Sequence, residues 1–291
     1  MPSGSPAGDG PDAGHAAAGR VVPAAPGPHP AGERRLLPRG PGVRLFVLVP
    51  VLDEAPNIPR LIGNLSRLAG DVRGEMECRV VFVDDGSADG TGDRIRQEAG
   101  PLPVEVLRHD VNLGPGRAFA TGFRHLASLL ADMDWVATME GDNTSRVETL
   151  RQMLVRRREG FEVVLASPYM YGGGLSNTSL LRLILSHGAN GLIKELLGIR
   201  GIVTMSSFFR LYSAPVLKRL QTRYGDGILE TSGFECMVEL LAKLIEVDAT
   251  ISEVAMPLDG AQRLGKSKMR LWRTIRGYLR VFLVGRKWRG R

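Results

Sequence analysis

The chain has 291 residues, of which 43% are hydrophobic and 24% charged, and its formal net charge is +7. This length and apolar content allow one large α/β domain or two small ones. The two cysteines, Cys78 and Cys236, exclude a disulfide framework and a thiolate metal site and fit a reducing cytosol. The N-terminus has no signal-peptide pattern, and no segment has the roughly 18 apolar residues of a membrane-spanning helix. We therefore expect a cytoplasmic protein.

The positive charge is concentrated at the C-terminal end. Residues 263–291 contain eleven Lys or Arg and no acidic residue, whereas residues 1–262 contain 27 basic and 31 acidic residues, a net charge of −4. The composition of the main body therefore excludes a nucleic-acid-binding surface, and we expect no nucleic-acid partner.

The N-terminal segment, residues 1–42, is dominated by Gly, Pro and Ala and has no periodic apolar pattern. Such a segment buries too little apolar surface to offset the entropy lost on ordering. We expect a disordered tail over residues 1–42, a folded domain over residues 43–265 and a distinct basic segment over residues 266–291.

From residue 43 onward, short apolar runs alternate with segments of helical periodicity. The apolar runs predict strands at residues 43–49, 79–83, 104–107, 135–139, 163–166 and 249–256, with a strand or turn at 206–212. The periodic segments predict helices at residues 58–68, 91–99, 115–130, 147–159, 180–197, 215–224 and 233–245. The alternation indicates an α/β fold with a doubly wound, mostly parallel sheet of Rossmann-like type. We expect the three glycines at residues 172–174 to form a flexible loop beside its crevice.

Three of the predicted strands end in carboxylates. The apolar run at residues 80–83 stops at Asp84 and Asp85, and the two other strands are followed by Asp53-Glu54 and by Glu140-Gly141-Asp142. In open α/β sheets ligands bind outside the carboxyl ends of the strands, so parallel strands would gather these groups along one edge. Their repulsion would be costly unless a cation or a donor-rich ligand sat among them. A single such loop is equally well a polar turn that ends a core strand.

The spacing of these carboxylates favours a nucleoside-diphosphate site. Glu140 and Asp142, one residue apart, can converge on one hard cation that would act as a Lewis acid on a departing diphosphate. Asp84, Asp53 and Glu54 are hydrogen-bond acceptors suited to base N–H groups and ribose hydroxyls.

The glycine-rich segment at residues 112–116 does not form a dinucleotide fingerprint, because Phe119 occupies the position where that motif needs a small residue. No phosphate-binding P-loop pattern occurs either. Two interpretations stay open: a close backbone approach to a ligand, with Arg117 in the first helical turn, or a glycine-rich turn.

The C-terminal segment has an apolar stripe with arginines interleaved. The stripe comprises Met269, Trp272, Ile275, Leu279 and Phe282. A basic amphipathic helix with aromatic residues suits an anionic membrane surface. The same stripe would equally allow the helix to dock on the folded domain.

Six motifs follow one another over about residues 44–270: Val49-Pro50-Val51-Leu52-Asp53-Glu54, residues 83–91 around Asp84 and Asp85, residues 112–116, Glu140-Gly141-Asp142, Gly233-Phe234-Glu235 and Arg263-Leu264-Gly265-Lys266-Ser267-Lys268. In these motifs the chain resembles the family 2 glycosyltransferases with a GT-A fold, most closely the polyprenol-phosphate (dolichol-phosphate) mannosyltransferase group. Each motif is modest alone, but their order and spacing together are specific.

The resemblance implies an inverting transfer from a nucleotide sugar, GDP-mannose or a UDP-sugar, to a polyprenyl phosphate at the cytoplasmic face of the membrane. It places the nucleotide sugar at Pro50, Leu52, Asp53, Glu54, Asp84 and Asp85. It places Mg²⁺ or Mn²⁺ at Glu140 and Asp142, and the acceptor phosphate at Arg263, Lys268 and His187. Asp142 and Arg263 would be the catalytic residues. A phosphate acceptor is already anionic and needs no strong general base.

The sequence departs from the family pattern mainly on the acceptor side. Glu140 replaces the first aspartate of the family's Asp-x-Asp motif, Pro168 stands where the family has arginine in Ser-Arg-Tyr, and His187 replaces a second arginine. The family's Thr-Ser-Gly-Phe-Arg segment reads Ser206-Ser207-Phe208-Phe209-Arg210. Because the family's arginines are expected to hold the lipid phosphate, two alternatives stay open: a glycosyltransferase acting on a soluble metabolite or natural product, and a non-catalytic nucleotide-sugar-binding protein.

Overall fold

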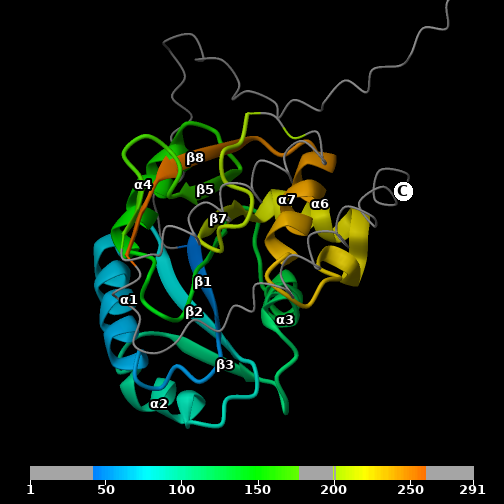
Figure 1. The fold of residues 1–291 in the computed structure, drawn as a ribbon. Coiled ribbons are helices and arrows are strands. Elements are labelled where there is room, and N and C mark those ends of the chain that lie inside the picture. The colour runs from blue at the N-terminus through cyan, green and yellow to red at the C-terminus, as the bar shows by residue number, and fades with distance from the viewer. Residues whose placement is uncertain (1–41, 177–198, 200, 260–291) are drawn as a thin grey trace, which may run out of the picture.

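The computed structural model describes residues 42–176, 199 and 201–259. Its strands are β1 (Arg44–Val51), β2 (Glu77–Asp84), β3 (Val104–Arg108), β4 (Trp135–Thr138), β5 (Val163–Ser167), β6 (Gly174–Ser176), β7 (Arg210–Ser213), β8 (Ile251–Ala255) and β9 (Pro257–Asp259). Seven of them form one sheet in the order β3-β2-β1-β4-β7-β5-β8 (Figure 1). Within this sheet β7 runs antiparallel to its neighbours β4 and β5, and the other pairs are parallel. The predicted doubly wound, mostly parallel sheet is confirmed.

Helices cover both faces of the sheet. They are α1 (Ile58–Val72), α2 (Thr91–Glu98), α3 (Pro115–Ala127), α4 (Val147–Arg158), α6 (Ala214–Tyr224) and α7 (Cys236–Glu246), with a 3₁₀ turn η1 (Gly225–Ile228). Helices α1 and α4 lie on one side of the sheet, and α3, α6 and α7 lie on the other (Figure 1). Two hydrophobic cores result, one under each helical layer.

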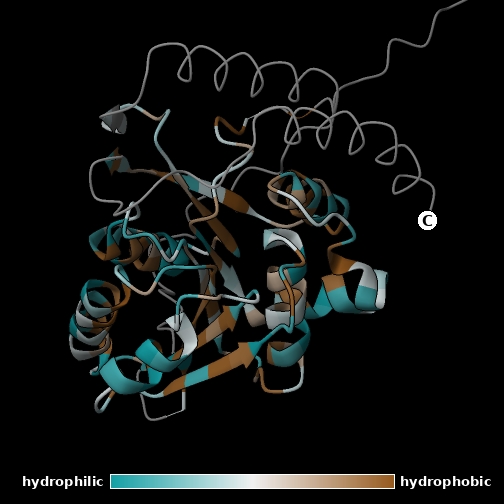
Figure 2. Ribbon diagram, turned by 60° about the horizontal axis from the view of Figure 1, so that its bottom comes forward, coloured by the Kyte–Doolittle hydropathy of each residue, from teal (hydrophilic) through white to brown (hydrophobic). Residues whose placement is uncertain are grey.

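The central strands are apolar because both of their faces are covered. Residues Leu45 to Val49 of β1 are all buried, and their side chains alternate between the two cores. Parallel strands enclosed by helices on both sides read as near-continuous hydrophobic runs for this reason. Figure 2 shows the strands of the sheet largely in the hydrophobic colour, while the helices carry hydrophilic colour as well.

Helix α1 illustrates how the apolar spacing sets the packing. Its buried residues are Ile58, Leu61, Ile62, Leu65, Leu68 and Val72, which recur at intervals of three and four. This spacing places them on one face of the helix, and that face packs into the same core as β1. Pro59 in the first turn has a fixed φ that suits a helix start.

A second, two-stranded sheet is formed by β6 and β9, which pair in parallel. The expectation of a flexible glycine loop at residues 172–174 is therefore corrected. Gly173 donates its N–H to the Met170 carbonyl at 2.8 Å, and a Cβ at Gly173 would lie 2.7 Å from the Ser167 carbonyl oxygen. These glycines form a tight turn, and Gly174 is the first residue of β6.

The remaining predicted elements agree with the structure to within a few residues, except that residues 206–209 form a loop and only Arg210–Ser213 form a strand. Both cysteines are buried and unbridged. Within the described ranges, no helix has the length and apolar character needed to cross a bilayer. The predicted N-terminal tail, the predicted helix at 180–197 and the C-terminal basic segment lie outside the described residues.

Candidate active site at the carboxyl edge of the sheet

The carboxyl ends of β2, β1 and β4 lie side by side. Asp84, the last residue of β2, is in register with Val51 of β1, and Thr138, the last residue of β4, is in register with Leu48. The loop after β4 continues along the end of β1, because a Cβ at Gly141 would lie 2.7 Å from Val51 Cγ1. The gathering of strand ends predicted from the sequence is therefore confirmed.

The loop after β4 is organised by its own hydroxyl groups. The Asp142 Oδ1 atom accepts hydrogen bonds from the Thr144 N–H at 3.0 Å and from the Thr144 hydroxyl at 2.6 Å. The Ser145 hydroxyl donates to the Glu140 carboxylate. These contacts fix the orientation of both carboxylates. The side-chain atoms that the loop offers as ligands are all oxygens, which suits a hard divalent cation.

Asn143, between these residues, has a left-handed backbone with φ of 63°. Its Nδ2 donates to the Asn57 carbonyl at 3.0 Å, which ties the loop to the start of α1. Its Oδ1 is buried and accepts no hydrogen bond in the part of the chain that the structure describes. The loop thus carries a buried, unsatisfied oxygen next to two carboxylates.

A metal ion fits this loop as a partner of two carboxylates. Within the described residues, no group of three or more His, Cys, Asp or Glu side chains forms a metal cage. Mg²⁺ commonly binds one or two protein carboxylates and takes its other ligands from substrate phosphates and water. Glu140 and Asp142 would provide the two carboxylates of a site of this kind.

Asp84 and Asp85 are both almost fully buried, and each has its own donors. Asp84 accepts the Ser87 N–H at 2.9 Å and a hydrogen bond from Arg108 at 3.2 Å. The repulsion expected between the clustered carboxylates is thus partly offset by hydrogen bonds and by the charge of Arg108.

Asp85 holds the loop that leads into α3. Its carboxylate accepts the N–H groups of Leu113 and Gly114 at 2.9 and 2.8 Å and contacts His109 Nδ1 at 2.7 Å. The other nitrogen of His109 lies 2.9 Å from the Thr121 hydroxyl of α3. Sequence reasoning missed His109, whose only signal was its position two residues after the strand predicted at residues 104–107.

The turn after β1 is held against the turn after β2. Asp53 has a left-handed φ of 46°, and its Oδ1 accepts the Ala88 N–H at 2.9 Å. The Glu54 N–H donates to the Thr91 hydroxyl at 2.8 Å, and its carboxylate accepts from Asn57 at 2.5 Å. Pro50 and Leu52 are partly exposed beside this turn.

The two glycines at the start of α3 are required by a contact within the protein. The Gly116 N–H donates to the Ser232 carbonyl at 2.8 Å, and a Cβ at Gly116 would lie 2.1 Å from the Thr231 carbonyl oxygen. A Cβ at Gly114 would lie 2.4 Å from the Ser232 oxygen. Of the two interpretations of residues 112–116, these contacts support the glycine-rich turn, which here packs against the backbone of residues 231–232.

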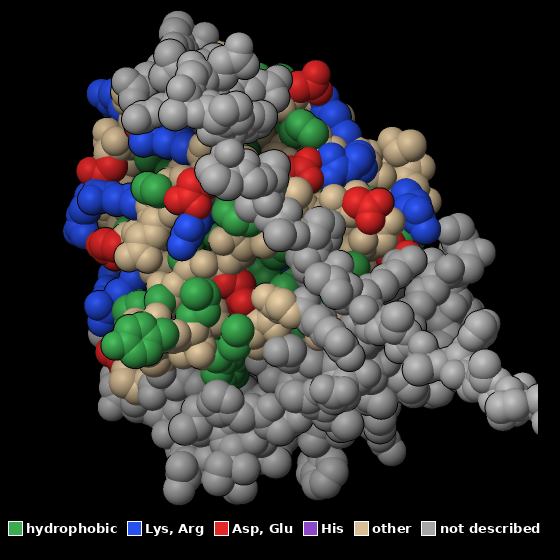
Figure 3. All heavy atoms as spheres, turned by 90° about the horizontal axis from the view of Figure 1, so that it is seen from above, with side chains coloured by type: hydrophobic (Ala, Val, Ile, Leu, Met, Phe, Trp, Pro, Cys, Tyr) green, Lys and Arg blue, Asp and Glu red, His purple; other side chains and the backbone are tan. Residues whose placement is uncertain are grey.

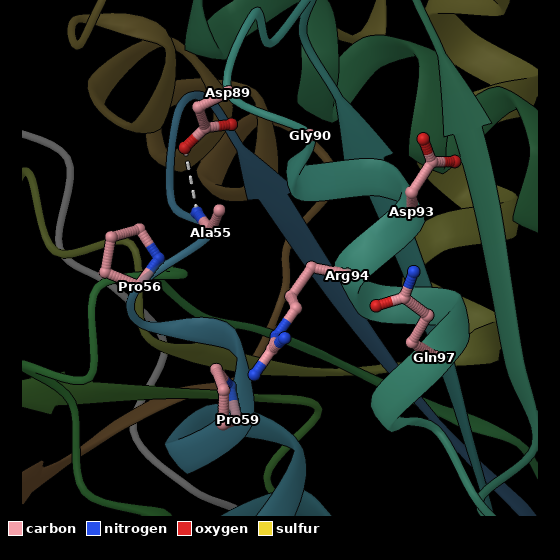
Figure 4. Close-up of a pocket in the computed structure, with 8 residues that line it drawn as sticks. All are labelled: Ala55, Pro56, Pro59, Asp89, Gly90, Asp93, Arg94 and Gln97. Atoms are coloured by element: carbon pink, nitrogen blue, oxygen red, sulfur yellow. Dashed lines mark hydrogen bonds between the residues drawn. The ribbon is translucent and has the colours of Figure 1, made fainter.

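A pocket of about 520 Å³ opens between the start of α1 and α2 (Figure 4). It is lined by Ala55, Pro56, Pro59, Asp89, Gly90, Asp93, Arg94 and Gln97. Burial opposes ionisation of Asp89, but hydrogen bonds from Thr91 and the Ala55 N–H outweigh it and hold the pKa of this carboxyl below its usual value. None of the predicted site residues within the described ranges lines the pocket, so it adds no residue to the site predicted from the sequence.

The other half of the edge is formed by the loop before β7. Because β7 is antiparallel, its first residue, Arg210, lies next to Thr138 at the carboxyl edge. Arg210 is fully buried and donates to the carbonyls of Ser207 and Met205 at 2.7 and 2.8 Å, while the Thr138 hydroxyl donates to the Phe208 carbonyl at 2.6 Å. This loop is therefore firmly anchored at the end of β4.

The predicted acceptor residues His187, Arg263 and Lys268 lie outside the described residues. The segments that carry them leave the described structure from β6 and β9, whose last residues, Ser176 and Asp259, are in register. On the face drawn in Figure 3, acidic and basic side chains are interspersed and a group of apolar side chains lies toward one side.

Comparison with known proteins identifies relatives on the basis of sequence. The family profile described as Glycosyl transferase family 2 matches residues 46–221. The polyprenol monophosphomannose synthase of Mycolicibacterium smegmatis is 29% identical over 236 residues, which cover 79% of this chain and 82% of that protein. The dolichol-phosphate mannosyltransferase of Pyrococcus furiosus is 27% identical over 256 residues, which cover 85% of this chain and 65% of that protein.

A similar fold occurs in glucosyl-3-phosphoglycerate synthase from Mycobacterium tuberculosis, solved with Mn²⁺, UDP-glucose and phosphoglyceric acid. The TM-score is 0.59 with 19% sequence identity, over 84% of this chain and 80% of that one. The identity is low enough that this likeness bears on the fold alone, and it confirms the expected GT-A architecture.

Proposed function

The chain belongs to glycosyl transferase family 2, and we propose that it transfers a sugar, with inversion, from a nucleoside-diphosphate sugar to a polyprenyl phosphate at the cytoplasmic face of the membrane. The observation that carries this proposal is the alignment of Asp84 with the loop of Glu140 and Asp142 along one edge of the sheet. The names of the two relatives, a polyprenol monophosphomannose synthase and a dolichol-phosphate mannosyltransferase, support a polyprenyl phosphate as the acceptor.

The donor would lie along the ends of β1 and β2. Pro50, Leu52, Asp53 and Glu54 would line the nucleoside, and the buried Asp84 would accept from its donor groups. Asp85 would serve the same site indirectly, since its oxygens already hold the loop before α3.

Glu140 and Asp142 would hold Mg²⁺ or Mn²⁺ together with the diphosphate oxygens. When bound, such an ion neutralises the charge that develops on the leaving diphosphate. The Thr144 and Ser145 hydroxyls would keep the two carboxylates oriented, because each already donates to one of them.

In the proposed reaction an oxygen of the acceptor phosphate attacks the anomeric carbon from the face opposite the diphosphate. The bond from that carbon to the diphosphate oxygen breaks, and the nucleoside diphosphate leaves. The attacking oxygen is already anionic, so no strong general base is required. Arg263, as a catalytic residue, with Lys268 and His187, would hold the acceptor phosphate, each as a hydrogen-bond donor.

The first experiment is a donor panel with a matched pair of variants. Purified protein is incubated with GDP- and UDP-sugars, Mn²⁺ and vesicles containing polyprenyl phosphate, and the released nucleoside diphosphate is measured. Asp142→Asn should lower turnover by about a hundredfold or more, since metal stabilisation of the leaving group contributes several kcal/mol. Asp132→Asn, an exposed carboxylate paired with Lys218, should leave turnover unchanged. Equal activity of the two variants would remove the metal assignment.

A second candidate, transfer to a soluble metabolite or natural product, is favoured by Pro168 in the place of a family arginine. Replacing the lipid by soluble acceptors in the same assay distinguishes the two. Turnover that requires the vesicles supports the lipid acceptor, and turnover with a soluble acceptor alone supports this second candidate. Binding of nucleotide sugar without any turnover would instead support a non-catalytic binder.

We propose that residues 43–265 form the catalytic domain and that residues 266–291 bind the membrane surface peripherally. The proposal is supported by the eleven basic residues among residues 263–291, which are interleaved with apolar ones, because such a pattern suits an anionic membrane surface. A flotation assay with anionic vesicles should recover the full chain in the lipid fraction and a chain truncated after residue 266 in the soluble fraction. Equal flotation of both would contradict the membrane role.

A further inference from the structure

Helix α7, in the layer that also holds α3 and α6, contains a fully buried ion pair. Glu239 and Lys243, one turn apart, are both inaccessible to solvent, and Lys243 Nζ lies 2.5 Å from Glu239 Oε1. A buried ion pair is weak grounds for stability, because desolvation of both charges offsets much of their attraction. The hydrogen bonds that such a pair makes are directional, so they can fix the position of the backbone groups that they reach.

The hydrogen bonds from this pair to the backbone reach one segment, residues 227–231. Glu239 accepts the N–H groups of Glu230 and Thr231 at 2.8 and 2.9 Å and the Thr231 hydroxyl at 2.6 Å. Lys243 donates to the Gly227 carbonyl at 2.5 Å and lies 3.4 Å from the Ile228 carbonyl oxygen. The pair therefore fixes both ends of this segment to α7.

Ser232, the residue that follows this segment, contacts residues 112–116, which lead into the first turn of α3. The Ser232 carbonyl accepts the Gly116 N–H, and the backbone of residues 231–232 lies so close to Gly114 and Gly116 that neither position has room for a Cβ. The Gly114 N–H in turn donates to Asp85 at 2.8 Å. A continuous series of contacts thus leads from α7 to the carboxylate beside Asp84.

We propose that the Glu239–Lys243 pair is a positioning pair for the donor site: it holds residues 230–232 in the register that places the loop of residues 112–116 on Asp85. The inference rests on the proposed function for its ligand, a nucleoside diphosphate. An apolar pair in the same place could fill the volume but could not fix the register, because apolar contacts are not directional.

The test uses the full chain with Glu239→Gln, Lys243→Met and the double variant. Amide hydrogen exchange of residues 112–116 is the first readout, and the dissociation constant for GDP and UDP with Mn²⁺, measured by calorimetry, is the second. Loss of one charge-assisted hydrogen bond corresponds to roughly a tenfold change in an equilibrium constant. We expect exchange at Gly114 and Gly116 to accelerate by about that factor and nucleotide binding to weaken by a similar one.

Glu162→Gln is the matched control. Like Glu239, Glu162 forms an ion pair, here with Arg219 at 2.7 Å, and accepts a backbone N–H, here from Thr250. Glu162 precedes β5, however, and so lies at the amino edge of the sheet. Its loss should lower the midpoint of thermal unfolding without altering exchange at residues 112–116 or nucleotide binding. All variants are compared at a temperature where near-UV circular dichroism shows them folded.

Faster exchange at residues 112–116 in the α7 variants, with none in the control, supports the positioning role. A lowered unfolding temperature with unchanged exchange and unchanged nucleotide affinity would overturn it and leave the pair purely structural. If the unaltered protein binds no nucleotide, the proposed function fails, but the exchange experiment still decides whether the pair positions the loop.

Discussion

The close contact between Gly116 and residues 231–232 predicts that an alanine, normally favourable in a helix, destabilises this one. In the first turn of α3 the change from glycine to alanine would gain up to about 1 kcal/mol of helix propensity. However, the new Cβ would lie 2.1 Å from the Thr231 carbonyl oxygen and 2.9 Å from the Ser232 carbonyl carbon. Both neighbours are backbone atoms, so the two segments must separate.

The magnitude follows from three contributions to the free energy of unfolding. Overpacking of this kind typically costs about 1–3 kcal/mol. Weakening of the hydrogen bond from Gly116 to Ser232 costs roughly 0.5–1.5 kcal/mol. After subtraction of about 1 kcal/mol for the propensity gain, Gly116→Ala should destabilise the protein by about 0.5–3.5 kcal/mol. At roughly 2–4 °C per kcal/mol for a domain of this size, the unfolding midpoint should fall by about 1–14 °C.

Urea denaturation and differential scanning calorimetry measure this effect, and Gly63→Ala is the control. Gly63 lies within α1, and a Cβ there would meet no atom within 4 Å, so alanine should stabilise the protein by about 0.5–1 kcal/mol. Substitution by alanine at these two helical glycines should therefore change the free energy of unfolding in opposite directions. If Gly116→Ala stabilised the protein as Gly63→Ala does, the reasoning from the close backbone contact would be refuted.

Three further outcomes follow from the structure. Burial opposes ionisation of Glu162, but hydrogen bonds from Arg219 and Thr250 hold its pKa below the usual value; its contribution to stability is therefore complete above the unfolded pKa of about 4.3 and lost as pH falls through the folded pKa. Acid denaturation should show a smaller pH dependence in Glu162→Gln than in the unaltered chain. Burial raises the pKa of Cys78 to about 12, so a thiol reagent should label it only after denaturant is added; rapid labelling of the native protein would contradict its burial. Removal of divalent ions with a chelator should abolish sugar transfer, and Mn²⁺ or Mg²⁺ should restore it; full activity in chelator would refute the assignment of Glu140 and Asp142.

The donor half of the edge could be predicted because its signals are local. Each of the strands β1, β2 and β4 is a short apolar run that stops at a carboxylate, and parallel pairing of such strands brings their ends together. The helical period of α1 is equally plain in the sequence. These elements therefore agree with their predicted positions.

Other features depend on contacts that no local pattern records. The direction of β7 is set by its pairing with β4 and β5. The sequence of Arg210–Ser213 does not indicate whether the strand runs parallel or antiparallel to its neighbours. Glu239 and Lys243 look like an ordinary surface pair one helical turn apart, and only tertiary packing buries them. For the same reason the glycines at residues 172–174 suggest a flexible loop in the sequence, although the carbonyls that surround Gly173 make them a compact turn.

The reversal of β7 divides the carboxyl edge into two parts of different origin. On the side of β1, β2 and β4, the edge is formed by segments that follow strands, whereas next to β4 it is formed by residues 203–209, which precede one. The two parts meet at the end of β4, where the Thr138 hydroxyl donates to the Phe208 carbonyl. A change of sequence in residues 203–209 would therefore reach the loop of Glu140 and Asp142 through the end of β4.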